Sequence, residues 1–127
     1  MIAFIKVPSL MEKTLVENLK RKRPIIDSID LAENGPKPSF VDLNTGEFCT
    51  RKCVFCPRFD DSQYPNQHLY MKIDLAKKIS KDLKSLEFKG IINISGNGEP
   101  LAHPEICDIV SILSDAAHVE IVTNGDL

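Results

Sequence analysis

The amino-acid sequence predicts an α/β fold in which strands alternate with helices, and three observations lead to this prediction. Short apolar runs at residues 40–43, 91–94 and 119–122 have the composition of β-strands. The segments between them, residues 74–86 and 104–113, carry apolar residues at helical spacing. The connections are short, which favours a parallel sheet with right-handed crossovers, either open or closed into a barrel.

A helix is expected ahead of this domain. Ser9 has the position of an N-cap, and Leu15 and Leu19 recur at one-turn spacing until Pro24, where the pattern is expected to stop. The basic run at residues 20–23 would then close the helix, because positive charge suits the negative end of the helix dipole. We interpret this run as a solvated helix end in preference to a binding site for polyanions.

An irregular connector is predicted after this helix. Three prolines and one glycine lie within residues 24–39, and this density disfavours regular structure. The chain is therefore divided into residues 1–38, a helix with its connector, and residues 39–127, which carry the sheet.

The sheet domain begins with a strand whose apolar run ends at the turn-forming residues Asn44, Thr45 and Gly46. After a polar stretch comes the first crossover helix, with Asp74 near its start and Gly90 just past its end. The apolar residues of this helix fall on one face. They are Leu75, Ile79, Leu83 and Leu86.

The second strand follows at once. Its isoleucines Ile91, Ile92 and Ile94 are typical of a strand that is buried on both faces. Pro104 suits the first position of the second crossover helix. The apolar stripe of that helix comprises Ile106, Ile109, Val110 and Leu113, and the third strand comprises Val119, Ile121 and Val122.

Three loops are expected to meet at one edge of this sheet. In parallel α/β architectures, the loops that leave the carboxyl ends of the strands share one edge or mouth. Here they are the cysteine-containing segment at residues 49–57, the turn at residues 95–100 and the turn at residues 123–125. These loops are far apart in the sequence, and the topology alone would bring them together.

Composition and charge exclude several classes of protein. A chain of 127 residues with 43% hydrophobic residues can bury a sizeable core. Its 16 basic and 18 acidic residues give a formal charge of −2, too balanced for binding nucleic acid or membranes through bulk electrostatics. The apolar opening segment is interrupted by Lys6 and Pro8 and is too short to span a bilayer, so we expect a cytoplasmic protein.

The strongest chemical signal is a group of three cysteines, Cys49, Cys53 and Cys56, on the loop after the first strand. A reducing compartment favours metal ligation by such a group over disulfide formation. Thiolates suit iron–sulfur clusters, and three ligands for four irons leave one iron open to a small molecule. The fourth cysteine, Cys107, stands alone and is expected to be an ordinary core or helix-surface residue.

These motifs closely resemble the radical S-adenosylmethionine (SAM) superfamily. Its members carry three cysteines at this spacing with an aromatic residue before the third, a position held here by Phe55. Residues 96–100, Gly-Asn-Gly-Glu-Pro, look like the family's glycine-glycine-glutamate motif, and residues 123–125 resemble the segment after its third strand. The family core has six strand–helix units, so the resemblance implies a partial parallel (β/α) barrel of about three strands.

The resemblance implies a [4Fe–4S] cluster on the three cysteines and SAM on the open iron. Phe55 is expected against the adenine, and Gly96, Gly98 and Glu99 near the methionine amino group. Reductive cleavage of SAM would give a 5′-deoxyadenosyl radical that abstracts hydrogen from an unidentified substrate, a peptide or a small molecule. The implied partners are an electron donor such as flavodoxin or ferredoxin and a chain that completes the barrel. No residue of this chain is assigned a catalytic role.

Several alternatives stay open. The cysteines could form a structural zinc site with His68 as fourth ligand, in a truncated or split module without catalytic activity. Glu99 could merely cap the turn that follows it. Asn97 replaces a glycine of the family motif and is expected to adopt the left-handed conformation. Arg51 and Arg58 flank the cysteines, either as charges that tune the cluster or as solvated side chains.

Overall fold

The computed structural model describes residues 9–27 and 37–127, with the side chains of the first helix described from residue 13 onward. In chain order the helices and strands are α1 (Ser9–Asp27), β1 (Phe40–Asn44), α2 (Ile73–Ser85), β2 (Ile91–Ser95), α3 (Ile106–Ser114) and β3 (His118–Ile121). Two short 3-10 helices, η1 (Pro57–Phe59) and η2 (Pro100–Ala102), lie in the loops. No helix of the described residues is long and apolar enough to cross a membrane.

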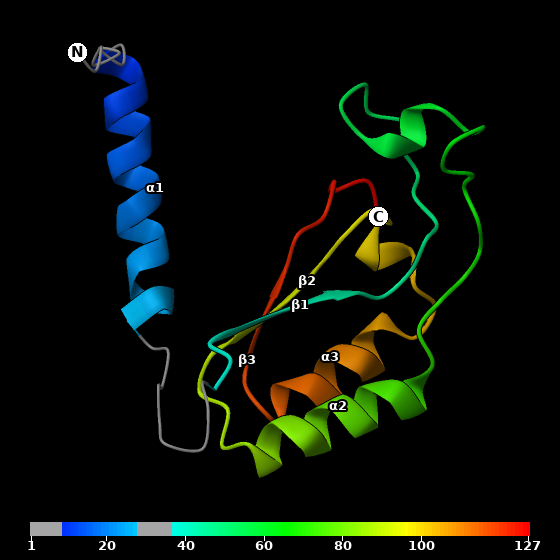
Figure 1. Ribbon diagram of the computed structural model, residues 1–127. Coiled ribbons are helices and arrows are strands. Elements are labelled where there is room, and N and C mark those ends of the chain that lie inside the picture. Colours follow the sequence, from blue (N-terminus) through cyan, green and yellow to red (C-terminus); the bar gives the residue numbers. More distant parts are fainter. Residues whose placement is uncertain (1–8, 28–36) are drawn as a thin grey trace.

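The three strands form one parallel sheet in the order β1-β2-β3 (Figure 1). Phe40 pairs with Ile91, and Ile91 pairs in turn with His118, so all three strands begin at the same level. The Val122 amide donates to the Ile94 carbonyl at 2.9 Å, which extends the pairing one residue beyond β3. The α/β class and the three parallel strands predicted from the sequence are thereby confirmed.

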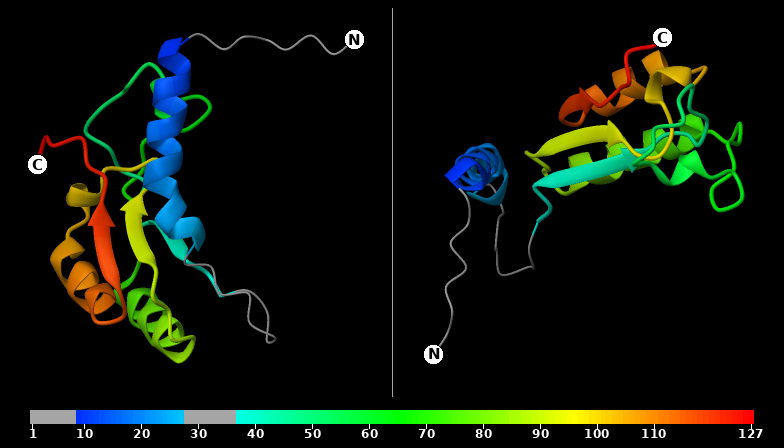
Figure 2. Two further views of the ribbon diagram at one scale, coloured as in Figure 1. Left: turned by 90° about the vertical axis from the view of Figure 1, so that its left-hand side faces the viewer. Right: turned by 90° about the horizontal axis from the view of Figure 1, so that it is seen from above.

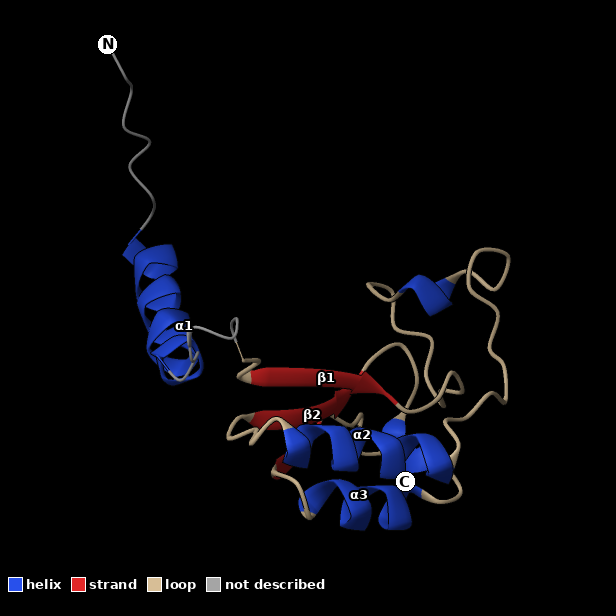
Figure 3. Ribbon diagram, turned by 60° about the horizontal axis from the view of Figure 1, so that its bottom comes forward, coloured by secondary structure: helices blue, strands red, loops and turns tan. Residues whose placement is uncertain are grey.

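Both crossover helices, α2 and α3, lie side by side on the same face of the sheet (Figures 1 and 3). The predicted apolar positions of α3 pack into the core, whereas α2 buries a slightly different face from the one predicted, since Leu75 and Leu86 are about half exposed. Pro104 lies in a turn ahead of α3 rather than at its first position. The core between helices and sheet consists of Ala76, Leu83, Phe88, Ile92, Ile94, Ile109 and Leu113.

The prediction that β2 is buried on both faces is wrong. Ile92 and Ile94 point toward the helices and are fully buried, but the alternate residues Ile91, Asn93 and Ser95 are only partly buried. The reason is that α2 and α3 cover one face only, which leaves a polar row on the other. There Asn93 Nδ2 and Ser95 Oγ both donate to Asp42 Oδ1, at 2.8 and 2.6 Å.

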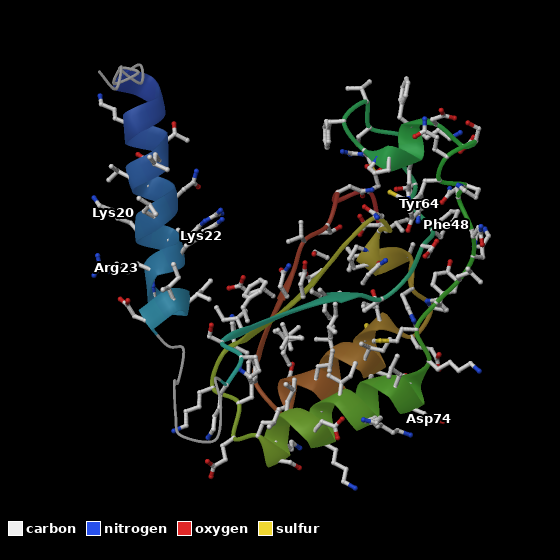
Figure 4. The ribbon with its side chains drawn as sticks, in the orientation of Figure 1. Lys20, Lys22, Arg23, Phe48, Tyr64 and Asp74 are labelled. Atoms are coloured by element: carbon white, nitrogen blue, oxygen red, sulfur yellow. The ribbon has the colours of Figure 1, made fainter. Side chains whose placement is uncertain are left out.

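The first helix continues past the position where it was expected to stop. Pro24 lies inside α1, which ends at Asp27. Proline has no backbone N–H, so one helical hydrogen bond is lost at Pro24. The amides of the three residues after it remain available to complete the last turn. The basic run at residues 20–23 therefore lies within the helix and not at its end, and its side chains are exposed, as the solvated interpretation expected (Figure 4). The remainder of the predicted connector, residues 28–36, lies outside the described residues, as does the Ser9 side chain.

Helix α1 stands apart from α2 and α3 (Figures 1 and 2). Its C-terminal end contributes Pro24 and Ile25 to a shallow hollow that is also lined by Ser39, Gly90 and Ile91. These last residues lie at the amino ends of β1 and β2. The C-terminal end of α1 therefore lies at the amino ends of the strands. The loop that carries the cysteines lies at the opposite end, where the strands finish.

Candidate cluster site

The cysteine-containing segment leaves the carboxyl end of β1 and is closed at its base. Gly46 forms an antiparallel bridge with Tyr70, flanked by hydrogen bonds from the Met71 amide to Thr45 O and from the Glu47 amide to Leu69 O, both 2.9 Å long. A Cβ atom on Gly46 would lie 2.9 Å from Cδ1 of the Tyr70 ring, so a larger residue would have to displace that ring. Residues 48–68, hereafter the cysteine loop, therefore extend from a fixed base above the sheet (Figure 1).

Cys49, Cys53 and Cys56 are all unpaired and partly accessible on this loop. The Cys56 amide donates to Cys53 O at 2.9 Å, which forms a turn between the second and third cysteine. Two N–H groups point at the first sulfur: the Arg51 amide lies 3.5 Å and Asn124 Nδ2 3.8 Å from Cys49 Sγ. N–H donors to sulfur are a usual feature of iron–sulfur sites. The donor set thus fits a thiolate-bound cluster.

Among the described residues, no three His, Cys, Asp or Glu side chains are arranged to hold a single metal ion. His68, the fourth ligand in the zinc alternative, stacks its ring on Phe48 with 4.2 Å between centroids, and its Nδ1 lies 3.1 Å from the Tyr70 hydroxyl.

Phe55, predicted to lie against adenine, is highly exposed on the cysteine loop. Its side chain is 88% exposed, and the neighbouring Val54 is 79% exposed. Large apolar side chains that are exposed side by side, here next to the cysteines, indicate a surface that a ligand or another part of the protein covers.

The turn after β2 depends on Gly96. Its φ angle of +122° is open mainly to glycine, and a Cβ atom would lie 2.7 Å from Asn44 Oδ1 at the end of β1. The expected left-handed conformation of Asn97 is wrong, because Gly96 takes the positive φ angle and no such angle is needed at the next residue.

Gly98 brings the turn after β2 into contact with the base of the cysteine loop. A Cβ atom there would lie 2.0 Å from Gly46 O, an impossible contact with backbone. The next residue continues the contact, since the Glu99 amide donates to Phe48 O at 2.8 Å. The glycine therefore serves close packing of two loops within the chain, in addition to any approach by a ligand.

Glu99 is buried, with 3% of its surface exposed, and both of its carboxylate oxygens are used. Oε1 accepts from the Leu101 amide at 3.0 Å and from Thr123 Oγ1 at 2.6 Å, and Oε2 accepts from the Asn124 amide at 2.8 Å. The capping bond to Leu101 is the one that the sequence left open as an alternative. The other two bonds tie the turn after β2 to the segment after β3.

Arg58 is buried and bonded to distant residues, which the sequence did not indicate. It is 1% exposed, donates through Nε to Asn97 O, and places its guanidinium 4.6 Å from the centroid of the Tyr64 ring (Figure 4 labels Tyr64). Its Nη1 donates to Asn66 Oδ1 at 3.3 Å, and its Nη2 lies 3.9 Å from the Glu47 carboxylate. Of the two interpretations left open, a solvated side chain is therefore wrong for Arg58.

Asn66 was also missed, although it holds the first cysteine directly. Its side-chain amide pairs with both backbone groups of Cys49: Oδ1 accepts from the cysteine amide at 2.9 Å and Nδ2 donates to its carbonyl at 3.0 Å. The only sequence signal was an asparagine after a proline, which is common in loops generally.

The segment after β3 bonds to the cysteine loop through the carboxylate of Asp126. Asp126 accepts from Thr50 Oγ1 at 3.1 Å and from Arg51, whose Nε lies 2.8 Å away. The hydrogen bond to Asp126 raises the pKa of Arg51, and the same bond lowers the pKa of Asp126. Arg51 therefore stays charged beside the cysteines with its charge compensated by an aspartate 75 residues away. Cys107, in contrast, is exposed on α3.

Comparisons with known proteins agree with this geometry. The family model described as "Radical SAM superfamily" matches residues 43–127, more than half of the chain. Among solved structures, the chain is similar to one described as "Crystal structure of BtrN in complex with AdoMet and 2-DOIA", with 27% sequence identity and a TM-score of 0.58. The alignment covers 70% of this chain and 37% of BtrN. No curated protein matches the chain at a significant level.

Proposed function

Because the chain belongs to the radical SAM superfamily, we propose that it forms the cluster-binding part of a radical SAM enzyme. The proposal rests mainly on one observation: three unpaired cysteines lie on a loop that is bonded to the segment after β3. The match spans 37% of the length of BtrN, and we therefore propose, rather than infer from the match, that the complete protein has the activity of a whole radical SAM enzyme.

In this proposal Cys49, Cys53 and Cys56 hold a [4Fe–4S] cluster and leave one iron open to SAM. When bound, the cluster supplies the electron that cleaves SAM into methionine and a 5′-deoxyadenosyl radical, which abstracts hydrogen from a substrate, a peptide or a small molecule. The presence of AdoMet in the BtrN crystal structure supports SAM as the ligand. The electron would come from a donor such as flavodoxin or ferredoxin. Reduced thiols suit the cytoplasm, where we place the protein.

The remaining residues of the site would position SAM. Phe55 offers an exposed aromatic ring to cover the adenine. Gly96 lets the turn after β2 pack against Asn44 at the end of β1, and Gly98 brings the turn against the base of the cysteine loop. Glu99 fixes the backbone of that turn. Since both Glu99 oxygens already accept hydrogen bonds, its contribution to binding the methionine amino group would combine a negative charge with an ordered backbone.

The experiment that tests this proposal is anaerobic reconstitution with iron and sulfide. We expect about four irons and four sulfides per chain, with broad absorption near 400 nm. Alanine at Cys49, Cys53 or Cys56 should abolish the cluster. Cys107→Ala is the matched control, because it removes a free cysteine that lies on α3, and it should retain the full iron content. Stoichiometric zinc without iron uptake would reject the proposal in favour of a structural module.

A further inference from the structure

Asp126 makes a bidentate contact with the cysteine loop. Its Oδ1 accepts from Arg51 Nη2, and its Oδ2 accepts from Arg51 Nε at 2.8 Å and from Thr50 Oγ1 at 3.1 Å. Bidentate pairs of arginine and carboxylate fix geometry better than a single contact does. The two residues that Asp126 holds follow Cys49 directly in the sequence.

The aspartate is itself held in place by a compact turn. The Gly125 amide donates to Thr123 Oγ1 and the Asp126 amide donates to Asn124 Oδ1, both at 3.0 Å. Gly125 has a φ angle of +75°, which lets the chain reverse between these two bonds. The side chain of Asp126 is thus presented by a defined backbone and not by a loose end.

The turn is anchored to the buried part of the domain. Glu99, buried under the loops, accepts from the Thr123 hydroxyl and the Asn124 amide. The Asn124 side chain then donates to Thr50 Oγ1 at 3.0 Å and lies 3.8 Å from Cys49 Sγ. A continuous series of hydrogen bonds therefore runs from Glu99 through the turn after β3 to the first cysteine.

A second ion pair in the same loop provides a comparison. Lys52, the neighbour of Arg51, pairs with Asp61, and both side chains are 55% exposed, compared with 51% for Arg51 and 32% for Asp126. That pair joins two residues of the cysteine loop nine positions apart. It lacks the bidentate geometry, and it does not tie the loop to another strand.

We propose that Asp126 is a positioning residue for the cluster, which holds the Thr50–Arg51 segment so that Cys49 is directed toward its iron. This inference rests on the proposed function. Asp126 would also compensate the charge of Arg51 close to the cluster. Reduction of the cluster adds negative charge, so removing either partner should change the reduction potential through electrostatics as well as through geometry.

The first test uses the full chain without iron and is therefore independent of the proposed function. Hydrogen–deuterium exchange is measured on a peptide covering residues 48–53 in the parent, Asp126→Asn and Asp61→Asn. We expect roughly fivefold faster exchange in Asp126→Asn, the order of effect of a lost bidentate pair near the surface, and little change in Asp61→Asn. Equal exchange in Asp126→Asn and the parent would overturn the proposal.

The second test uses the reconstituted chain and separates positioning from a merely structural role. Loss of absorption near 400 nm under excess chelator should be several-fold faster in Asp126→Asn than in Asp61→Asn. The exchanged pair Arg51→Asp with Asp126→Arg should restore slow loss. The reduction potential should rise in Asp126→Asn and fall in Arg51→Gln, because one removes a negative and the other a positive charge.

The outcomes distinguish the two hypotheses. A parent chain that takes up no iron contradicts the proposed function, and with it the role of Asp126 toward a cluster. A parent that binds iron, with Asp126→Asn as resistant to chelator as Asp61→Asn, overturns only the role of Asp126. Potentials that shift in the same direction in Asp126→Asn and Arg51→Gln would also overturn it, because they would show an effect of structure alone.

Discussion

Glu99 connects two of the three loops at the site through a single buried carboxylate. Its three hydrogen-bond donors come from its own turn and from the segment after β3. Hydrogen bonds that a carboxylate accepts are stronger than hydrogen bonds between neutral groups. A residue that resembles a ligand for SAM therefore also organises the backbone around the ligand.

Replacing Glu99 with alanine should leave the iron content intact, because no metal ligand is removed. The three unpaired donors should cost about 2–4 kcal/mol in the free energy of unfolding. SAM binding, measured by equilibrium dialysis on the reconstituted chain, should weaken for lack of the charge and of the ordered turn. Glu99→Gln keeps the side-chain size and should fall between alanine and the parent. If alanine and the parent bind SAM equally well, the motif is only a turn.

The sequence was informative about individual residues where their partners are near in the chain. The three cysteines could be grouped because they lie within eight residues, and Glu99 could be noticed between a glycine and a proline. Arg58 and Asp126 could not be assigned, because their partners Asn97 and Arg51 are 39 and 75 positions away. Only the fold brings such residues together, and no periodic pattern marks them.

At the scale of elements, the contact between two loops depends on a missing side chain. Gly98→Ala places a Cβ atom against Gly46 O, where backbone must move. We expect a loss of roughly 2 kcal/mol in unfolding free energy, typical of forced overpacking, measured by denaturant titration at low protein concentration. Gly125→Asn is the control, since its Cβ meets nothing within 4 Å and asparagine tolerates a positive φ angle. Equal stability of both variants would contradict this role of Gly98.

The elements themselves were largely predictable from hydrophobic spacing. Strands β1 to β3 and helices α2 and α3 appear where apolar runs and one-turn spacing place them. The errors arose where burial depends on neighbours far away in the chain. Ile91 resembles a core residue in the sequence, yet it lies on the face of β2 that the helices leave open. Helix α1 passes through Pro24 because only one of its hydrogen bonds is lost there.

At the scale of the whole molecule, the sheet is open at both edges. Strands β1 and β3 each pair only with β2, so neither has a partner strand on its outer side among the described residues. Unpaired edges of this kind promote association between chains. The match covers 37% of the BtrN chain, and we expect further strand–helix units to cover the open edges and to complete the site. The partial barrel could be predicted because three motifs match the family in order. The sequence does not indicate which chain supplies the further strand–helix units.

The measurement that tests the central claim most directly is the formation of 5′-deoxyadenosine from SAM under strong reductant. The reconstituted 127-residue chain alone should be prone to aggregation and should cleave SAM very poorly. Addition of a chain that provides the missing strand–helix units should restore solubility and cleavage together, since one event closes the edge and completes the site. Cys53→Ala should abolish the product in both cases. A stable monomer that makes 5′-deoxyadenosine at the rate of an enzyme would contradict the partial-barrel account, and a cluster-loaded, completed barrel that makes none would contradict radical SAM chemistry itself.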